Sequence, residues 1–268
     1  MKRTSEYIKK IVKQGYAKVA TQKTSCCSSG SCCGGNVSAS DISKTVGYGD
    51  DEINAVPDGA NLGLGCGNPV AIASLKEGDV VLDLGSGAGF DSFLASKKVG
   101  KTGRVIGVDM TPEMVKRART NVQKGNYSNV EFRLGEIERL PVEDCSIDVI
   151  ISNCVINLSP DKEAVFNEAF RVLRNGGRLM VSDLVLDKEL PEDIQKSVEA
   201  YVGCIAGAIK KSEYLGFIEN AGFSDVQIIS QSSYPVDAMF ENLESAQDSV
   251  LSIKVSAIKK MNGGNNEN

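Results

Sequence analysis

Histidine is absent from the 268 residues of the sequence. Catalytic machinery of the Ser-His-Asp or Cys-His type is therefore excluded, and so is a zinc site that uses imidazole. Any side chain that transfers a proton in catalysis has to be an aspartate, glutamate, lysine, tyrosine or cysteine. The absence of one residue type thus restricts the chemistry before any motif is considered.

An excess of positive charge and a long apolar run are missing as well. The formal net charge is −5, which argues against a general nucleic-acid-binding protein. No run of about 18 apolar residues occurs, so no membrane-spanning helix is expected, and Met1–Ser5 is not followed by the apolar stretch of a signal peptide. We expect a cytoplasmic protein, whose eight cysteines stay reduced and bind metals or react more often than they form structural disulfides.

Residues 1–46 are predicted to form an N-terminal helix and a cysteine-rich arm. Apolar side chains recur at helical spacing over residues 5–20, with lysines between them, which indicates an ordinary amphipathic helix with a solvated polar face. Residues 24–35 are small and without periodicity, which indicates a mobile arm. The arm carries Cys26, Cys27, Cys32 and Cys33.

Short apolar runs alternate with helical segments from residue 79 onward, which predicts an α/β fold with a doubly wound parallel sheet. After Asp183 the pattern changes to a pair of helices and then a pair of strands, and residues 262–268 are expected to be disordered. The predicted strands cover residues 80–84, 104–109, 130–134, 148–152, 178–182, 226–230 and 250–258. The predicted helices cover residues 90–98, 112–124, 161–174 (closed by Asn175-Gly176-Gly177), 191–209 and 211–221.

A glycine-rich loop follows the first strand in the run Asp83-Leu84-Gly85-Ser86-Gly87-Ala88-Gly89-Phe90. Its glycines let the backbone turn sharply and approach a ligand closely. Asp109 ends the second strand, where a carboxylate can hold both hydroxyls of a ribose. The loop departs from the dinucleotide fingerprint because Phe90 stands in place of the third, helix-packing glycine. Asp83 adds negative charge, which suits a cationic sulfonium better than a phosphate.

These features resemble those of the Rossmann-like S-adenosylmethionine-dependent methyltransferases. The resemblance implies a seven-stranded sheet whose last strand is antiparallel, supplied by the two late strands. It implies that residues 47–261 form the methyltransferase domain, with 184–209 as a helical cover over the site, and that Tyr48 either closes over the cofactor or only packs. The cofactor-binding residues it implies are Asp83, Gly85, Ser86, Gly87, Gly89, Asp109, Met110, Glu136, Ile137 and Asn153.

Three cysteines fall where a sheet of this type builds its site. Cys154 follows the fourth strand directly, Cys66 lies in a glycine-rich loop before the sheet, and Cys204 lies on a predicted helix over the cleft. Several soft thiolates without imidazole select a soft, thiophilic ion or metalloid. Trivalent arsenic takes three sulfurs and keeps a lone pair, which can accept a methyl group without a general base.

The resemblance then narrows to the arsenite methyltransferases. It rests on residues 61–69, 83–91 and 107–114, on Asn153-Cys154 and on residues 201–208. It implies that Cys154 and Cys204 hold trivalent arsenic, and that Cys66 supports it and can form a disulfide with an arm cysteine, for which Cys32 and Cys33 are favoured. It further implies arsenite and methylated trivalent arsenicals as substrates, with glutathione or thioredoxin restoring the thiols.

Other interpretations stay open at this point. The arm cysteines could bind zinc or copper, since four thiols can close a tetrahedral site. Cys145, in a predicted turn, is expected to be exposed or to pack as a small apolar residue. The chain could methylate a small organic substrate such as a quinone or lipid precursor, or it could be a non-catalytic protein that binds metalloids through its thiols. Activity that survives loss of the thiols would favour the small organic substrate. Binding of a metalloid without methyl transfer would favour the non-catalytic protein.

Overall fold

The structure is a computed structural model that describes residues 4–21, 38–234, 236 and 249–260. The arm cysteines and the tail 262–268 lie outside these residues. The strands are β1 (Val80–Leu84), β2 (Arg104–Asp109), β3 (Val130–Leu134), β4 (Ile147–Asn153), β5 (Leu173–Leu186), β6 (Ser224–Ser233) and β7 (Val250–Ile258). Each of the seven predicted strands therefore exists.

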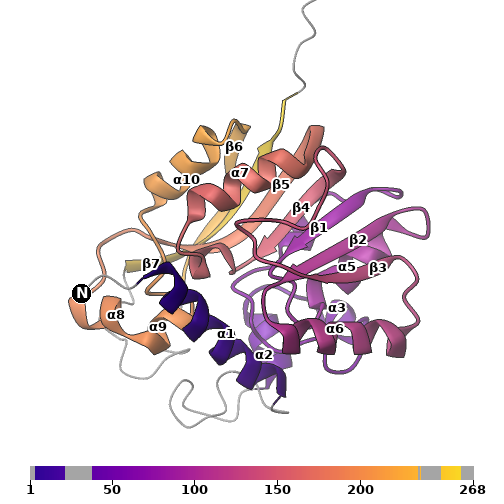
Figure 1. Cartoon of the computed structure of the whole chain (residues 1–268), viewed down its shortest axis with the longest axis horizontal. Coiled ribbons are helices and arrows are strands. Elements are labelled where there is room, and N and C mark those ends of the chain that lie inside the picture. Colours follow the sequence, from indigo (N-terminus) through magenta and orange to yellow (C-terminus); the bar gives the residue numbers. More distant parts are fainter. Residues whose placement is uncertain (1–3, 22–37, 235, 237–248, 261–268) are drawn as a thin grey trace, which may run out of the picture.

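The strands form one seven-stranded sheet in the order β3-β2-β1-β4-β5-β7-β6 (Figure 1). β1 to β5 run parallel to one another, whereas β7 is antiparallel to both β5 and β6. The predicted doubly wound, Rossmann-like sheet with a reversed C-terminal hairpin is confirmed. β1 and β4 are adjacent at the centre, where the strand order reverses, and a sheet of this kind binds ligands beyond the carboxyl ends of such strands.

The helices flank the sheet and cover its carboxyl edge. They are α1 (Ser5–Thr21), α2 (Ala39–Thr45), α3 (Asp50–Asn54), α4 (Pro69–Ile72), α5 (Phe90–Val99), α6 (Pro112–Gly125), the 3-10 turn η1 (Ile156–Leu158), α7 (Lys162–Val172), α8 (Glu192–Lys196), α9 (Val198–Val202) and α10 (Lys211–Asn220). α6 begins with Pro112 in its first turn, as its sequence predicts.

Alternate side chains of the central strands fill two separate cores. Leu82 and Ile150 belong to the core that includes Phe166 of α7, while Val81 and Ile151 belong to the core on the α5 side. This alternation follows from the pleat of a strand, and burial on both faces explains why these strands are almost entirely apolar. The central sheet is therefore a rigid base for the loops at its carboxyl edge.

A third apolar cluster lies outside the two sheet cores. It joins α1, α8 and α9 to the first residue of β7, and it contains Cys66, Cys154 and Cys204. We call these three residues the thiol cluster. Their thiols are thus enclosed by the segment between β5 and α10 and by the N-terminal helix, and they are not spread over the surface.

Two predicted helices are wrong in their extent. The helix predicted over 191–209 is broken at Ser197, which ends α8 in an extended conformation and caps α9 by accepting a hydrogen bond from the Ala200 N–H (3.1 Å). The helix predicted over 161–174 ends at Val172, because Leu173 is already extended and begins β5. Asn175-Gly176-Gly177 therefore lies within β5, with Gly176 at a φ of 81°, and does not close α7.

A search of the described residues finds no helix that combines the length and the apolar character needed to cross a bilayer.

Phe166 tests the core between α7 and the sheet. It is fully buried, and its ring meets that of Tyr214 edge-on at a centroid distance of 5.4 Å. Phe166→Ala is expected to lower the free energy of unfolding by about 3–5 kcal/mol, measured by urea denaturation. Ile229→Ala, at a side chain that is 49% exposed, should change it by no more than about 0.5 kcal/mol. Equal losses in the two variants would contradict the assignment of this core.

Candidate active site

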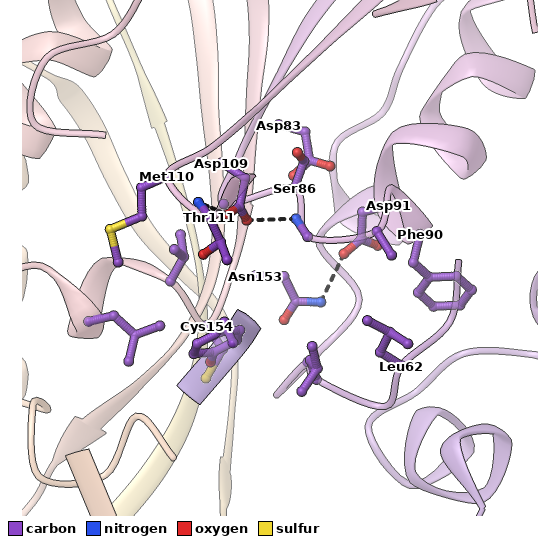
Figure 2. Close-up of a pocket in the computed structure, with 18 of the residues that line it drawn as sticks. Leu62, Asp83, Ser86, Phe90, Asp91, Asp109, Met110, Thr111, Asn153 and Cys154 are labelled. Carbon is purple, nitrogen blue, oxygen red and sulfur yellow. Dashed lines mark hydrogen bonds between the residues drawn. The ribbon is translucent and has the colours of Figure 1, made fainter. Parts of the chain in front are cut away.

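A pocket with about 1040 Å³ of empty space opens beyond the carboxyl ends of β1, β2 and β4 (Figure 2). We call it the glycine-loop pocket. Of the residues that the sequence predicts to bind the cofactor or substrate, those in its wall are Asp83, Gly85, Ser86, Gly87, Asp109, Met110, Ile137, Asn153 and Cys154. Gly89, Glu136, Cys66 and Cys204 do not form part of the wall.

The glycine loop adopts backbone conformations that residues with a side chain rarely adopt. Gly85, Gly87 and Gly89 all have positive φ angles, of 63°, 52° and 98°. Gly89 is the N-cap of α5, and a Cβ there would lie 2.7 Å from the rings of Phe93 and Phe132. Phe90 stands in the position of the third glycine, as expected, and Gly89 one position earlier leaves room for the Phe93 and Phe132 rings.

Asp109 is held rigidly at the end of β2. Its carboxylate accepts hydrogen bonds from the Gly87 N–H (2.9 Å) and from the Thr111 N–H (2.8 Å) (Figure 2). Burial raises the pKa of this carboxyl group. These bonds tie the loop after β1 to the loop after β2, so Asp109 faces the pocket in a fixed position.

Asn153 links the pocket wall to the loop that carries Cys66. Its Oδ1 accepts a hydrogen bond from the Cys66 N–H (3.1 Å). Its Nδ2 donates to Asp91 Oδ2 (3.0 Å) (Figure 2). The same Nδ2 lies 2.8 Å from the Tyr48 hydroxyl, which donates to Asp91 Oδ1 (2.6 Å). Tyr48 is 4% exposed. Its side chain is therefore packed into the wall as part of a hydrogen-bonded network.

The wall is acidic as well as apolar. Burial raises the pKa of Asp91 to about 6 and holds the pKa of Asp83 well above its ordinary value. Asp83 accepts a 2.5 Å hydrogen bond from the Ser92 hydroxyl. Desolvated carboxyl groups favour a positively charged ligand, because a cation beside them restores the balance of charge.

The helix α1 covers one side of the pocket, which its sequence did not reveal. Val12 and Tyr16 line the pocket together with Lys9, whose Nζ bonds to Glu136 (2.7 Å) and lies 3.3 Å from Glu138. The expectation of an ordinary solvated helix was wrong for this face. Glu136 therefore acts as an anchor for α1 in this structure, while the neighbouring Ile137 and Glu138 form the wall.

The thiol cluster adjoins the glycine-loop pocket through one of its members, Cys154. Cys154 reaches the pocket wall, the Cys66 thiol donates to the Ser182 carbonyl (3.6 Å), and the Cys204 thiol donates to the Cys154 carbonyl (2.8 Å). All three are buried and free. Hydrogen bonding to the Cys204 and Cys66 thiols, together with burial, holds the pKa of Cys154 well above its ordinary value, and burial raises the pKa of Cys66.

Two of these cysteines have an unusual backbone. The φ angles of Cys154 and Cys204 are +56° and +67°, a region in which a non-glycine residue costs of order 1 kcal/mol and which occurs often at functional sites. Cys204 lies in the turn after α9, not on a helix as predicted, because Gly203 ends α9. Gly207 lets this turn approach η1, since a Cβ there would lie 2.1 Å from the Asn157 carbonyl oxygen.

Asp183 is a site residue that the sequence did not single out. The sulfurs of Cys66 and Cys154 and a carboxylate oxygen of Asp183 all lie within 4.8 Å of one another. Asp183 is fully buried, and it accepts hydrogen bonds from the Tyr214 hydroxyl (3.1 Å) and Asn157 Nδ2 (2.8 Å). Its position at the carboxyl edge of the fifth strand was the available signal.

Cys145 lies far from this site in the fold. It is exposed, in the turn before β4, and Lys259 Nζ lies 3.7 Å from its sulfur. The exposed position agrees with one of the two expectations for this residue.

Comparison with known proteins gives consistent relatives. A family model described as a methyltransferase domain matches residues 75–222. An arsenite methyltransferase of Halobacterium salinarum is 49% identical over 234 residues, which are 84% of this chain and 60% of that protein. An arsenite methyltransferase of Homo sapiens is 38% identical over 175 residues, which are 62% of this chain and 46% of that protein. The chain thus spans about half to three fifths of the length of these curated relatives.

A solved structure matches this chain over a larger share of its own length than these curated relatives do. The arsenic(III) S-adenosylmethionine methyltransferase of Chlamydomonas reinhardtii is 33% identical, with a TM-score of 0.66, and the match covers 83% of this chain and 74% of that chain. The sheet order, the glycine loop and the acid after β2 define a Rossmann-like methyltransferase of the S-adenosylmethionine-dependent class. Within that class, the chain belongs to the arsenite methyltransferase family.

The buried carboxyl group of Asp183 predicts a pH dependence of stability. Burial raises its pKa to about 7, against about 3.9 in an unfolded chain. The native state therefore holds this proton more tightly, so the stability that the proton contributes is complete below about pH 4 and is lost as the pH rises to about 7.

Asp183→Asn removes the pH-dependent contribution of the Asp183 proton to stability without changing the shape of the side chain. The difference in free energy of unfolding between the wild type and the variant should therefore fall between about pH 4 and 7 and stay constant above that. Urea denaturation at fixed ionic strength measures it. A difference that does not vary with pH would contradict the raised pKa.

Proposed function

We propose that this chain transfers the methyl group of S-adenosylmethionine to trivalent arsenic held by the thiol cluster. The observation that carries the proposal is the thiol cluster of Cys66, Cys154 and Cys204, which adjoins the glycine-loop pocket through Cys154. The direct test is incubation with arsenite, isotope-labelled S-adenosylmethionine and a thiol reductant, with detection of labelled methylarsenic. Its absence, from protein that binds both ligands, would refute the activity.

The wall of the glycine-loop pocket fits the methyl donor chemically. Asp109 would bind the ribose hydroxyls, the apolar side chains of Met110 and Ile137 would pack against the adenine, and Asn153 would contact the methionine end. When bound, S-adenosylmethionine supplies an electrophilic methyl group on a positively charged sulfur. Asp83 and Asp91 place desolvated carboxyl groups in the same wall, which supports a cationic ligand.

Protonated thiols are no obstacle to binding arsenite. Arsenite is As(OH)₃, and each thiol that bonds to arsenic sends its proton away with a hydroxide as water. Burial raises the pKa of Cys66, and the exchange needs no thiolate prepared in advance and no histidine. Three arsenic–sulfur bonds then leave a neutral complex with a lone pair on arsenic.

The lone pair makes a general base unnecessary. As the new arsenic–carbon bond forms from this pair, the sulfur–carbon bond of the donor breaks, and no proton leaves the nucleophile. The transfer oxidises arsenic by two electrons. We therefore propose glutathione or thioredoxin as the reductant that restores the thiols. We also propose that Cys32 or Cys33 of the arm forms the disulfide with Cys66. The setting we propose is cytoplasmic, where thiols stay reduced.

The domain organisation belongs to the same proposal. Residues 47–261 would form the catalytic domain and residues 184–209 its cover, with residues 1–46 as an N-terminal extension. The presence of α8, α9 and Cys204 within one apolar cluster supports the role of 184–209. The contacts of Lys9 and Tyr16 with the pocket give the first helix a part in closing it.

Cys154 provides the sharpest test of the thiol mechanism. Cys154→Ser keeps the shape of the side chain but replaces a soft sulfur by oxygen, so the rate of arsenite methylation should fall below about 1% of the wild-type rate. Calorimetric binding of S-adenosylhomocysteine should change by less than about threefold. Cys145→Ser is the matched control and should retain the wild-type rate. Full activity in Cys154→Ser would overturn the mechanism.

Asp109 tests the cofactor assignment. Asp109→Ala removes the carboxylate proposed to bind ribose, and a hydrogen bond to a charged group contributes about 1.5–3 kcal/mol. Affinity for S-adenosylhomocysteine should therefore fall by about 10–100-fold in calorimetric titrations. Glu113→Gln, at an exposed position on α6, is the control and should bind as the wild type does. Unchanged affinity in a folded Asp109→Ala protein would exclude the assignment.

A further inference from the structure

The thiol cluster has a neighbour that arsenic does not use. Trivalent arsenic held by three sulfurs leaves the carboxylate of Asp183 without a role, although one of its oxygens lies within 4.8 Å of the sulfurs of both Cys66 and Cys154. Two sulfurs and one oxygen in a buried group form the donor set of a borderline-soft metal ion. Asp183 therefore gives the site a second combination of ligands.

We propose that Cys66, Cys154 and Asp183 form a binding site for a divalent thiophilic cation of the zinc or cadmium type. Cys204 is not a ligand in this site, because it lies outside the group of donor atoms within 4.8 Å of one another and its thiol donates to the Cys154 carbonyl (2.8 Å). The thiol cluster and its neighbour Asp183 thus provide two ligand sets: three sulfurs for trivalent arsenic, and two sulfurs with one carboxylate for a divalent cation.

The spacing of the donor atoms suits such an ion. Zinc–sulfur bonds of about 2.3 Å in a tetrahedral site place two sulfurs about 3.8 Å apart, so donors within 4.8 Å need only a small contraction. Asp183 Oδ1 accepts from the Leu184 N–H (2.9 Å) and Asn157 Nδ2 (2.8 Å), whereas Oδ2 accepts from the Tyr214 hydroxyl (3.1 Å). Since each carboxylate oxygen has two lone pairs, Oδ2 can still bind a cation.

The balance of charge selects two thiolates and not three. Two thiolates and the Asp183 carboxylate carry three negative charges, and a divalent cation leaves one. The ammonium group of Lys162 donates to the Ser159 carbonyl (3.1 Å) and would offset that remainder: burial lowers its own pKa, and its charge opposes the rise in the pKa of Asp183. A third thiolate would leave a buried negative charge without a partner, which is costly. The Cys204 thiol instead keeps its hydrogen bond to the Cys154 carbonyl (2.8 Å).

Binding of the cation releases the protons of two thiols to solvent, and also that of the Asp183 carboxyl group at a pH below its pKa of about 7. Because Cys66 and Cys154 belong to both ligand sets, the cation and arsenic should exclude each other. This competition rests on the proposed function, whereas the cation site itself rests only on the donor atoms and the charges around them.

Cobalt(II) is the probe for the test, because its visible bands report tetrahedral sulfur coordination. The protein is the full chain with Cys26, Cys27, Cys32 and Cys33 replaced by serine, so that arm thiols give no background. One cobalt ion should bind per chain. Asp183→Asn and Cys66→Ser should each weaken binding at least about tenfold, the smallest loss usual even for groups that only support metal ligands. Cys204→Ser should bind cobalt within about twofold of the parent.

Arsenite titration of the same variants separates the two proposals. Cys204→Ser should lose arsenite but keep cobalt, and Asp183→Asn should lose cobalt but keep arsenite. Equal cobalt affinity in Asp183→Asn and the parent, or loss of cobalt in Cys204→Ser as large as in Cys66→Ser, would overturn the cation site. Failure of the parent to bind arsenite, with the cobalt pattern intact, would instead count against the proposed function. Thermal unfolding of each variant shows that the compared proteins are folded.

Discussion

One amide side chain joins the two halves of this site. Asn153 bonds the backbone of the loop that carries Cys66 and, on its other side, the Tyr48–Asp91 pair in the pocket wall. Leaving a buried polar group unpaired costs about 1–3 kcal/mol, so these partners hold one another in a single arrangement. Cys154 follows Asn153 directly in the chain. The positions proposed for the methyl donor and the acceptor are thereby linked by one residue, Asn153, which ends a central strand of the sheet.

Removal of water determines the chemistry that this arrangement supports. Burial raises the pKa values of Cys66, Asp91 and Asp183, so the site favours neutral forms of its own groups. A ligand that arrives neutral and carries protons away as water suits such a site. A ligand that arrives as a cation needs enough negatively charged thiolates and carboxylates around it to balance its charge. Charge balance, more than the count of sulfurs, therefore distinguishes a site for a neutral ligand from a site for a cation.

The sequence predicted the parts of the structure that depend on local patterns. Continuous apolar runs predicted the strands, and glycine spacing followed by Asp109 predicted the loop, because both signals lie within a few residues. The placement of α1 could not be predicted, because an amphipathic pattern shows that one face of a helix is buried but not which part of the protein covers that face. Lys9 pairs with Glu136, which is more than a hundred residues away in the sequence. Asp183 escaped notice because its meaning depends on the sulfurs of Cys66 and Cys154, which only the folded chain brings beside it.

The absence of histidine gains a sharper meaning from the pocket wall. A substrate that reacts through an O–H or N–H group would need a base within reach. The carboxylates that line the pocket are those of Asp83, Asp91, Asp109 and Glu138, and each already accepts hydrogen bonds from hydroxyl, amide or backbone N–H groups of the chain. They hold the loops in place and orient the wall. A nucleophile that needs no base, such as the lone pair of thiol-bound arsenic, fits a wall whose acidic groups are engaged in this way.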